Sequence, residues 1–126
     1  MSADKQNGTT DSAASVFVQA GVCGHKATVT AERVDGYNVW VQVESDCPHV
    51  QNIAPEPLQV DALGQMDLRT GLPSLLETAY SHCAHAACAV PSALIKAVEV
   101  AAGLALPENV SMKISKNNSE TTEKER

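Results

Sequence analysis

The sequence predicts an α+β fold, in which a three- to four-stranded, mainly antiparallel sheet carries helices packed on one face. Two patterns predict it. Apolar and polar residues alternate over residues 27–43 on both sides of a single Asp-Gly pair, which is typical of a half-buried β-hairpin. The stretch from Pro91 to Gly103 has few polar positions between a proline that suits a helix start and a glycine that suits a helix end. That stretch indicates a largely buried helix.

One folded domain is expected between two polar tails. The chain has 126 residues, of which 44% are hydrophobic, and this is enough for a single modest core. Residues 1–14 and 116–126 are too polar to bury an apolar surface, so we expect both to be disordered. The cysteine-rich α+β domain is therefore placed at residues 15–115.

The register of the hairpin follows from the requirement that both apolar sets face the same side. A two-residue loop at Asp35-Gly36 would oppose Val29 to Gln42 and put the two sets on opposite faces. A three-residue loop with Gly36 in the left-handed conformation instead pairs Val29 with Val41. We therefore expect that register, in which one face of the hairpin is apolar throughout.

The same register, continued toward the open end of the hairpin, places Cys23 opposite Cys47 on the apolar face. Directly opposed residues have Cβ atoms about 4.5–5.5 Å apart. The two thiols are therefore expected to hold one metal ion or one edge of a cluster, at the open end of the hairpin.

The remaining elements follow from local patterns. We expect a strand at residues 15–20, a short helix at 48–54, a second short helix from Asp61, a helix at 72–81, the buried helix that begins at Pro91, and a final strand in which Val110, Met112 and Ile114 alternate with polar residues.

Composition and charge exclude several classes of function. The formal net charge is −6 and no run of Lys or Arg is present, so nucleic acid is not an expected partner. No stretch approaches the about 18 apolar residues that a membrane span needs, and no secretion signal is recognisable. We expect a cytoplasmic protein, and in a reducing compartment cysteines serve more often as ligands or reactive thiols than as disulfides.

Cysteines and histidines occur together. Each of the four histidines lies within two residues of one of the four cysteines. Thiolates and imidazoles are the ligands of zinc and of iron–sulfur clusters. The predicted ligands are Cys23, Cys47, Cys83 and Cys88, with an iron–sulfur cluster expected ahead of zinc. His82, beside Cys83, is the histidine best placed as an alternative fourth ligand.

Other readings stay open at this stage. A cross-strand disulfide, reactive thiols or simple packing would each explain some of the cysteines. His25 and His49 are as readily surface residues or supporting neighbours of a metal as ligands, and the role of His85 is open. Asp46 is expected to cap the short helix after Cys47, with a position near the metal as the alternative.

Over residues 20–103 the layout resembles the iron–sulfur scaffold family of IscU, SufU and the NifU N-terminal domain. In that family a Cys-Gly precedes a hairpin, a second cysteine follows it at a helix start, and a His-Cys pair precedes a late helix. Cys23-Gly24, Cys47 and His82-Cys83 match those places. The resemblance implies that the three cysteines bind a cluster or zinc, with His82 as a fourth ligand. The family usually has an aspartate shortly after its first cysteine, where this chain has His25.

A second resemblance is to the small TSCPD domain, found alone or attached to ribonucleotide reductases. Its scheme of Gly-Val-Cys, a DG hairpin, Cys-Pro and a late cysteine before a helix is matched by Gly21-Val22-Cys23, Asp35-Gly36, Cys47-Pro48 and Cys88. This resemblance implies an accessory module with a structural metal.

The function expected from the sequence is that of an iron–sulfur cluster-binding protein, acting in cluster storage, delivery or electron transfer. The alternatives are a zinc-dependent sulfur acceptor or sulfurtransferase, and a ribonucleotide-reductase-associated module. No catalytic residue is assigned, and we expect the chain not to be an enzyme by itself. A protein partner in cluster or sulfur transfer is expected, and a chain of this size could share a cluster across a homodimer.

Overall fold

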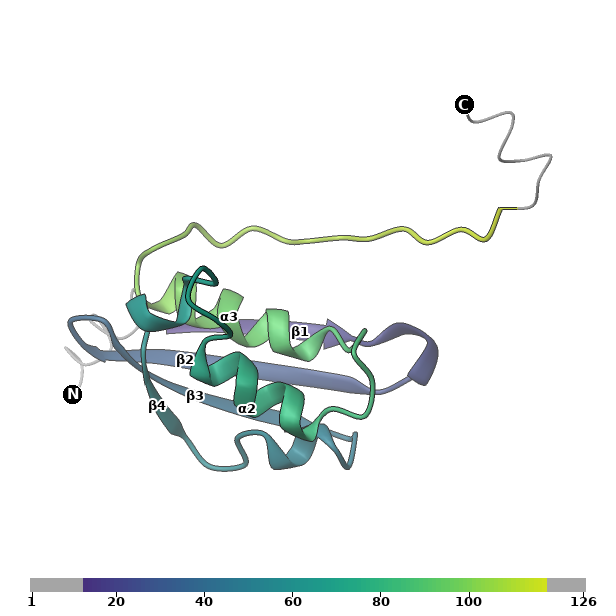
Figure 1. The fold of residues 1–126 in the computed structure, drawn as a ribbon, viewed down its shortest axis with the longest axis horizontal. Helices are drawn as coiled ribbons and strands as arrows, with labels where there is room; N and C mark the ends of the chain where they lie inside the picture. The colour runs from purple at the N-terminus through teal and green to yellow at the C-terminus, as the bar shows by residue number, and fades with distance from the viewer. Residues whose placement is uncertain (1–12, 118–126) are drawn as a thin grey trace.

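The computed structural model, which describes residues 13–117, confirms the α+β fold (Figure 1). An antiparallel sheet is formed in the order β1-β2-β3-β4 by β1 (Ala13–Gln19), β2 (Lys26–Asp35), β3 (Asn38–Ser45) and β4 (Leu58–Asp61). Helices α2 (Ser74–His82) and α3 (Val90–Ala101) pack on one face of it, and α3 contacts β1, β2 and β3. Three single-turn 3-10 helices, η1 (Gly21–Cys23), η2 (Val50–Asn52) and η3 (Leu63–Gln65), lie in the connections.

The core lies between the sheet and the two helices, as the alternating pattern of the hairpin predicts. Val29 on β2 and Val39 on β3 are fully buried, and Leu94 on α3 is buried against this face. On the opposite face of the sheet, Phe17 and Trp40 are exposed. Apolar side chains therefore stabilise one face of the sheet, and the other carries polar residues with these two aromatic rings.

The predicted pairing within the hairpin is wrong by two residues, although both apolar sets do share a face. Val29 pairs with Val43, not with Val41. The turn is short, because Asp35 already pairs with Asn38, and the register shifts between Arg33 and Asp35. A two-residue turn alone would put the apolar side chains of the two strands on opposite faces, and the one unpaired residue of the bulge returns them to the same face. A shift of two residues leaves every side chain on its predicted face.

The correction also removes the predicted cross-strand pair of cysteines. The strand β2 begins at Lys26 and β3 ends at Ser45, so Cys23 and Cys47 both lie beyond the ladder. Cys23 ends the 3-10 turn η1, whose following residue, Gly24, has a left-handed φ of 78°. The chain thus turns sharply between Cys23 and β2 instead of continuing the strand.

Other sequence predictions differ in part. The helix expected at residues 48–54 is only the turn η2, the second short helix is the turn η3, and the strand β4 was not predicted. The strand expected at residues 110–114 does not form: this segment pairs with no strand of the described region, and Ile114 is 91% exposed. An alternating segment forms a strand only where it can pair with a free edge of a sheet.

The predicted tails fall almost entirely outside the described residues, which begin at residue 13 and end at residue 117. The domain starts slightly earlier than expected, since Ala13 and Ala14 already pair with β2. None of the helices in the described part of the chain has the length and apolar character needed to cross a membrane.

Candidate functional site

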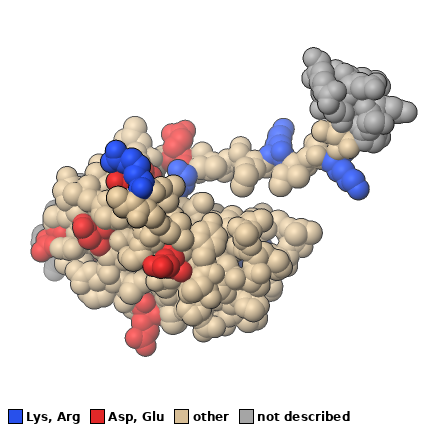
Figure 2. All heavy atoms as spheres, in the orientation of Figure 1, with Lys and Arg blue, Asp and Glu red and all other residues tan. Residues whose placement is uncertain are grey.

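The loops that carry the four cysteines meet at one end of the molecule, at the right in Figure 1. Cys23 ends η1, Cys47 follows β3, Cys83 caps the C-terminus of α2, and Cys88 lies just before α3. All four are free thiols. Figure 2 shows mostly uncharged surface at this end of the helical face, whereas acidic side chains are scattered elsewhere. The structure thus brings the predicted residues together from three separate connections.

Three of the cysteines line a small hollow at this end. Its walls are formed by Cys23, Cys47 and Cys88, by His25, and by Ala20, Lys26, Ala27, Ser45, Val50 and Val90. Its volume is about 30 Å³. A cavity needs roughly 10–15 Å³ of this kind of volume to hold one water. The hollow therefore has room for a single ion or for a few water molecules at most.

Cys83 belongs to an overlapping group of thiols. Burial raises the pKa of the Cys83 thiol to about 12, and a hydrogen bond and the charge of Cys88, together with the charge of Cys47, add to the effect. These causes require the three sulfur atoms to be near one another, because charge effects weaken with distance. Cys47 and Cys88 therefore belong both to this group and to the lining of the hollow.

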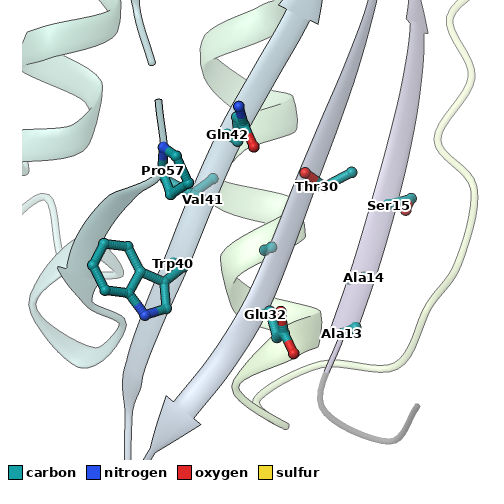
Figure 3. Close-up of a pocket in the computed structure, with 10 residues that line it drawn as sticks. Ala13, Ala14, Ser15, Thr30, Glu32, Trp40, Val41, Gln42 and Pro57 are labelled. Atoms are coloured by element: carbon teal, nitrogen blue, oxygen red, sulfur yellow. The ribbon is translucent and has the colours of Figure 1, made fainter. Parts of the chain in front are cut away.

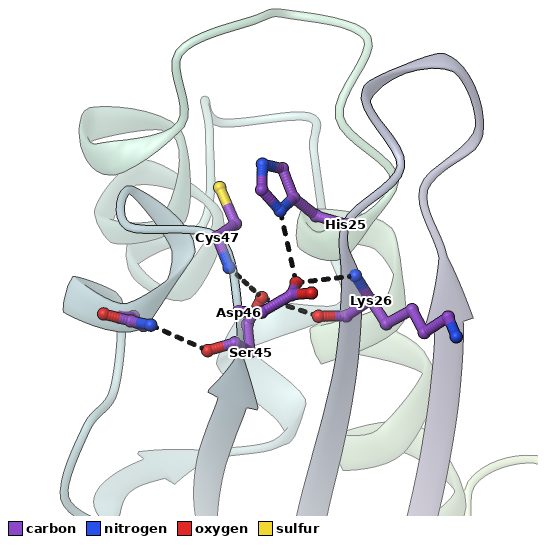
Figure 4. Close-up of polar contacts among 6 residues, drawn as sticks. His25, Lys26, Ser45, Asp46 and Cys47 are labelled. Carbon is purple, nitrogen blue, oxygen red and sulfur yellow. Dashed lines mark hydrogen bonds and ion pairs between the residues drawn. The ribbon is translucent and has the colours of Figure 1, made fainter.

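The backbone around Cys47 is fixed by polar contacts (Figure 4). The Ser45 hydroxyl accepts a hydrogen bond from the Cys47 amide at 3.0 Å and donates one to the Lys26 carbonyl at 2.7 Å. The side chain of Gln51 donates a hydrogen bond to the Ser45 carbonyl at 2.9 Å, and its backbone N–H donates one to the Cys47 carbonyl at 3.0 Å. The loop that presents this thiol is therefore tied to both β2 and η2.

Asp46 does not cap the helix after Cys47, contrary to the sequence prediction. Its Oδ1 instead accepts a hydrogen bond from the Lys26 amide at 2.9 Å and lies 3.2 Å from His25 Nδ1 (Figure 4). The hydrogen bond from Lys26 is the main cause that lowers the pKa of Asp46, and His25 lowers it further. The short turn η2 has His49 at its N-cap position and no side-chain cap. Asp46 thus orients the imidazole of His25.

The histidines are placed differently from one another. His25 is half-buried and lines the hollow, whereas His49, His82 and His85 are exposed and are not among its lining residues. His82 lies in the last turn of α2, next to Cys83. Sequence reasoning gave His25 no priority over the others. A signal was available in principle, because His25 and Asp46 lie just outside the two paired strands of the hairpin.

The donors are near one another without converging on a single point. Within residues 13–117, no three His, Cys, Asp or Glu side chains already stand where they could hold a metal ion together. Binding through these residues therefore requires thiols to turn toward a common centre. Cysteine has a single χ1 angle with staggered minima, so such a turn is a small conformational change.

A second, larger hollow lies on the open face of the sheet and was not predicted (Figure 3). It has a volume of about 280 Å³, and its lining includes Trp40, Glu32, Gln42 and Thr30. No cysteine or histidine lines it. Its lining therefore contains no thiol or imidazole that could bind a soft metal.

Comparison with known proteins places this chain in a family without giving it an activity. A family model described as "Family of unknown function (DUF6951)" matches residues 14–114, and the chain belongs to this family. The match covers nearly all of the described fold. No curated protein and no solved structure matches the chain.

Proposed function

We propose that this member of the DUF6951 family binds a metal centre through Cys47 and Cys88, with Cys83 and Cys23 as the further thiolate ligands, and that the bound group is an iron–sulfur cluster. The observation that carries the proposal is that Cys47 and Cys88 belong to both thiol groups at this end of the fold. Cys23 shares the hollow with this pair and Cys83 lies near it, so three connections bring four thiols to one end of the fold, and a tetrathiolate centre needs four such donors.

The electrostatics of the thiols supports a cationic occupant. The raised pKa of Cys83 means that burial first, and then the neighbouring Cys88 and Cys47, make a thiolate at this position unfavourable in the protein alone. A bound metal reverses this, because a coordinating thiol loses its proton outright. A cation bound by these residues would therefore offset the cost of ionising Cys83.

Partial exposure supports a cluster that is delivered or exchanged. Cys23 is exposed, and Cys47, Cys83 and Cys88 are only partly buried. A centre held by them lies at the surface, where a protein partner can reach it. We therefore assign the chain to cluster carriage or delivery, with no reaction catalysed by the chain itself.

A single zinc ion is the second candidate, because the hollow lined by Cys23, Cys47 and Cys88 has a volume of only about 30 Å³. That space suits one ion better than several iron and sulfide atoms, unless the cluster extends toward solvent at the exposed Cys23. Zinc with thiolate ligands is four-coordinate and tetrahedral in structural sites. The zinc form would make the centre structural or sulfur-accepting.

Anaerobic purification of the full chain tests the proposal. Visible absorption and analysis of iron, acid-labile sulfide and zinc are measured on the wild type, on Cys47→Ser and Cys88→Ser, and on His49→Ala as the matched control. Brown protein whose iron and sulfide are lost in the two cysteine variants, and kept in the control, supports a cluster. Colourless protein with stoichiometric zinc overturns the cluster and supports the second candidate. Protein that stays metal-free after reconstitution overturns both.

A further inference from the structure

The observed register changes which residue faces Cys47. The ladder ends where Ala27 pairs with Ser45, and continuing its register outward would oppose Lys26 to Asp46 and then His25 to Cys47. The first of these steps is visible as hydrogen bonds, because the Asp46 amide donates to the Lys26 carbonyl at 3.4 Å and Asp46 Oδ1 accepts from the Lys26 amide at 2.9 Å. His25 directly precedes β2 and Cys47 closely follows β3, so the two residues lie at adjacent strand ends, and both line the hollow (Figure 4).

The hydrogen bond between Asp46 and His25 fixes the chemistry of the imidazole. A carboxylate accepts hydrogen bonds and cannot donate them, so at 3.2 Å from Asp46 Oδ1 it is His25 Nδ1 that carries the hydrogen. In the neutral imidazole this leaves the lone pair on Nε2, the nitrogen on the far side of the ring from the carboxylate. A carboxylate on one ring nitrogen and a metal on the other is the usual arrangement of metal-binding histidines.

We propose that His25 is a ligand of the thiolate centre through Nε2, and that Asp46 is the positioning residue that holds its ring. This assignment rests on the proposed function and refines its ligand set, since His25 takes the place of one of the four cysteines and the role of alternative fourth ligand that the sequence predicts for His82. His25 lines the hollow together with Cys23, Cys47 and Cys88, whereas His82 is exposed and does not line it.

The assignment has a chemical consequence for the centre. Replacing one thiolate by a neutral imidazole removes one negative charge from the ligand set, which raises the reduction potential of an iron–sulfur cluster. For a single ion, a set of thiolates with one imidazole is a common zinc site. Because Cys83 is absent from the lining that holds His25 and the other three cysteines, it is the cysteine that His25 would most readily replace.

Cobalt(II) titration of the reduced, metal-free full chain tests this ligand assignment. Thiolate-to-cobalt charge transfer and the visible ligand-field bands report affinity and ligand type separately. We expect His25→Ala to weaken binding strongly and to change the ligand-field bands, and Asp46→Asn to weaken it by about 10- to 100-fold. His49→Ala and His82→Ala are the matched controls and should leave both readouts unchanged. Imidazole added to His25→Ala should restore the wild-type bands.

The outcomes separate this inference from the proposed function. A wild-type chain that takes up neither cobalt, zinc nor iron overturns the function and the ligand assignment together. A wild type that binds cobalt through thiolates, with His25→Ala indistinguishable from it, overturns only the assignment, and loss of binding in His82→Ala alone would transfer the role to that residue. His25→Gln covers the case in which His25→Ala does not fold, because Gln keeps a donor toward Asp46 and has no imidazole.

Discussion

Cys83 should react with an alkylating reagent far more slowly in the folded, metal-free protein than in the unfolded chain. Its pKa is raised from the ordinary value of 9.0 to about 12. At pH 8 the thiolate fraction therefore falls about a thousandfold, and the thiolate is the reactive form. A thiolate of higher pKa is intrinsically more nucleophilic, with a Brønsted slope of about 0.4–0.5, so the net slowing is about 30- to 60-fold before any effect of access.

The neighbouring thiols give this prediction its internal test. Burial is the largest cause of the shift, followed by the hydrogen bond and charge of Cys88. Cys88→Ser should therefore lower the pKa of Cys83 and recover part of the lost rate, with the part due to burial remaining. Cys23→Ser is the matched control, because Cys23 is not among the causes of the shift.

The assay is timed alkylation with iodoacetamide under reducing, anaerobic conditions, followed by peptide mass spectrometry. It compares Cys83 in the native chain with the same residue in urea, so that the reagent and the sequence context are unchanged. Equal alkylation rates of Cys83 in the native chain and in urea would refute the burial of Cys83 beside Cys88 and Cys47. An equal acceleration by Cys23→Ser and Cys88→Ser would refute it as well. Loading the protein with metal should protect Cys47 and Cys88 from the same reagent under the proposed function, since a ligated thiolate is not free to react.

Three further predictions concern stability. Leu94→Ala, at a fully buried position, should lower the free energy of unfolding by about 3–5 kcal/mol, measured by urea titration with circular dichroism. Leu106→Ala, at an 84% exposed position, should change it by less than about 0.5 kcal/mol. Similar losses in the two variants would contradict the assigned core. Gly24→Ala should cost about 1–2 kcal/mol because its φ is +78°, although no atom lies within 4 Å of the added Cβ, and an unchanged melting temperature would argue against that turn. Because the pKa of Cys83 is raised, the unfolded chain releases the thiol proton at a lower pH than the folded chain. The free energy of unfolding should therefore be unaffected below pH 9 and fall between pH 9 and about pH 12, by about 1–2 kcal/mol after solvent screening. In urea titrations over this pH range Cys83→Ala should lose less stability than the wild type, and an identical loss would count against the shift.

The sequence predicts the buried face of the hairpin well and its pairing poorly, for one physical reason. Alternation with period two determines which side chains face the core, and burial enforces that choice. It does not distinguish Val41 from Val43 as the partner of Val29, because both lie on the same face. The turn decides between them, and a bulge near Asp35 changed the turn without changing the face.

Prediction from sequence is also limited for very short strands and for alternating segments that find no sheet edge to pair with. The strand β4 has four residues, Leu58–Asp61, and begins directly after Pro57, so its alternation is too brief to recognise. Val110, Met112 and Ile114 show a longer alternation and form no strand in the described region. Whether an alternating segment pairs depends on a free sheet edge within reach, which is a property of the whole fold.

For the candidate site, the gathering of the four cysteines could be predicted and the rank of the histidines could not. The ends of a hairpin lie close together, so Cys23 and Cys47 had to be near neighbours in any register. Every histidine is close in sequence to a cysteine, and this proximity therefore favours none of them. The contact that distinguishes His25 joins it to Asp46, a residue 21 positions away, and depends on the register.

The register of the hairpin determines which side chains lie together at its open end. In the predicted pairing, two thiols would face each other across the hairpin, and a cross-strand disulfide would compete with metal binding. In the structure the ladder ends before both cysteines, and His25, Cys47 and Cys23 all line the hollow beyond it. A thiol beside an imidazole cannot be lost to a disulfide with that partner. Under the proposed function, Cys47 would serve as a ligand beside an imidazole whose ring Asp46 holds in place.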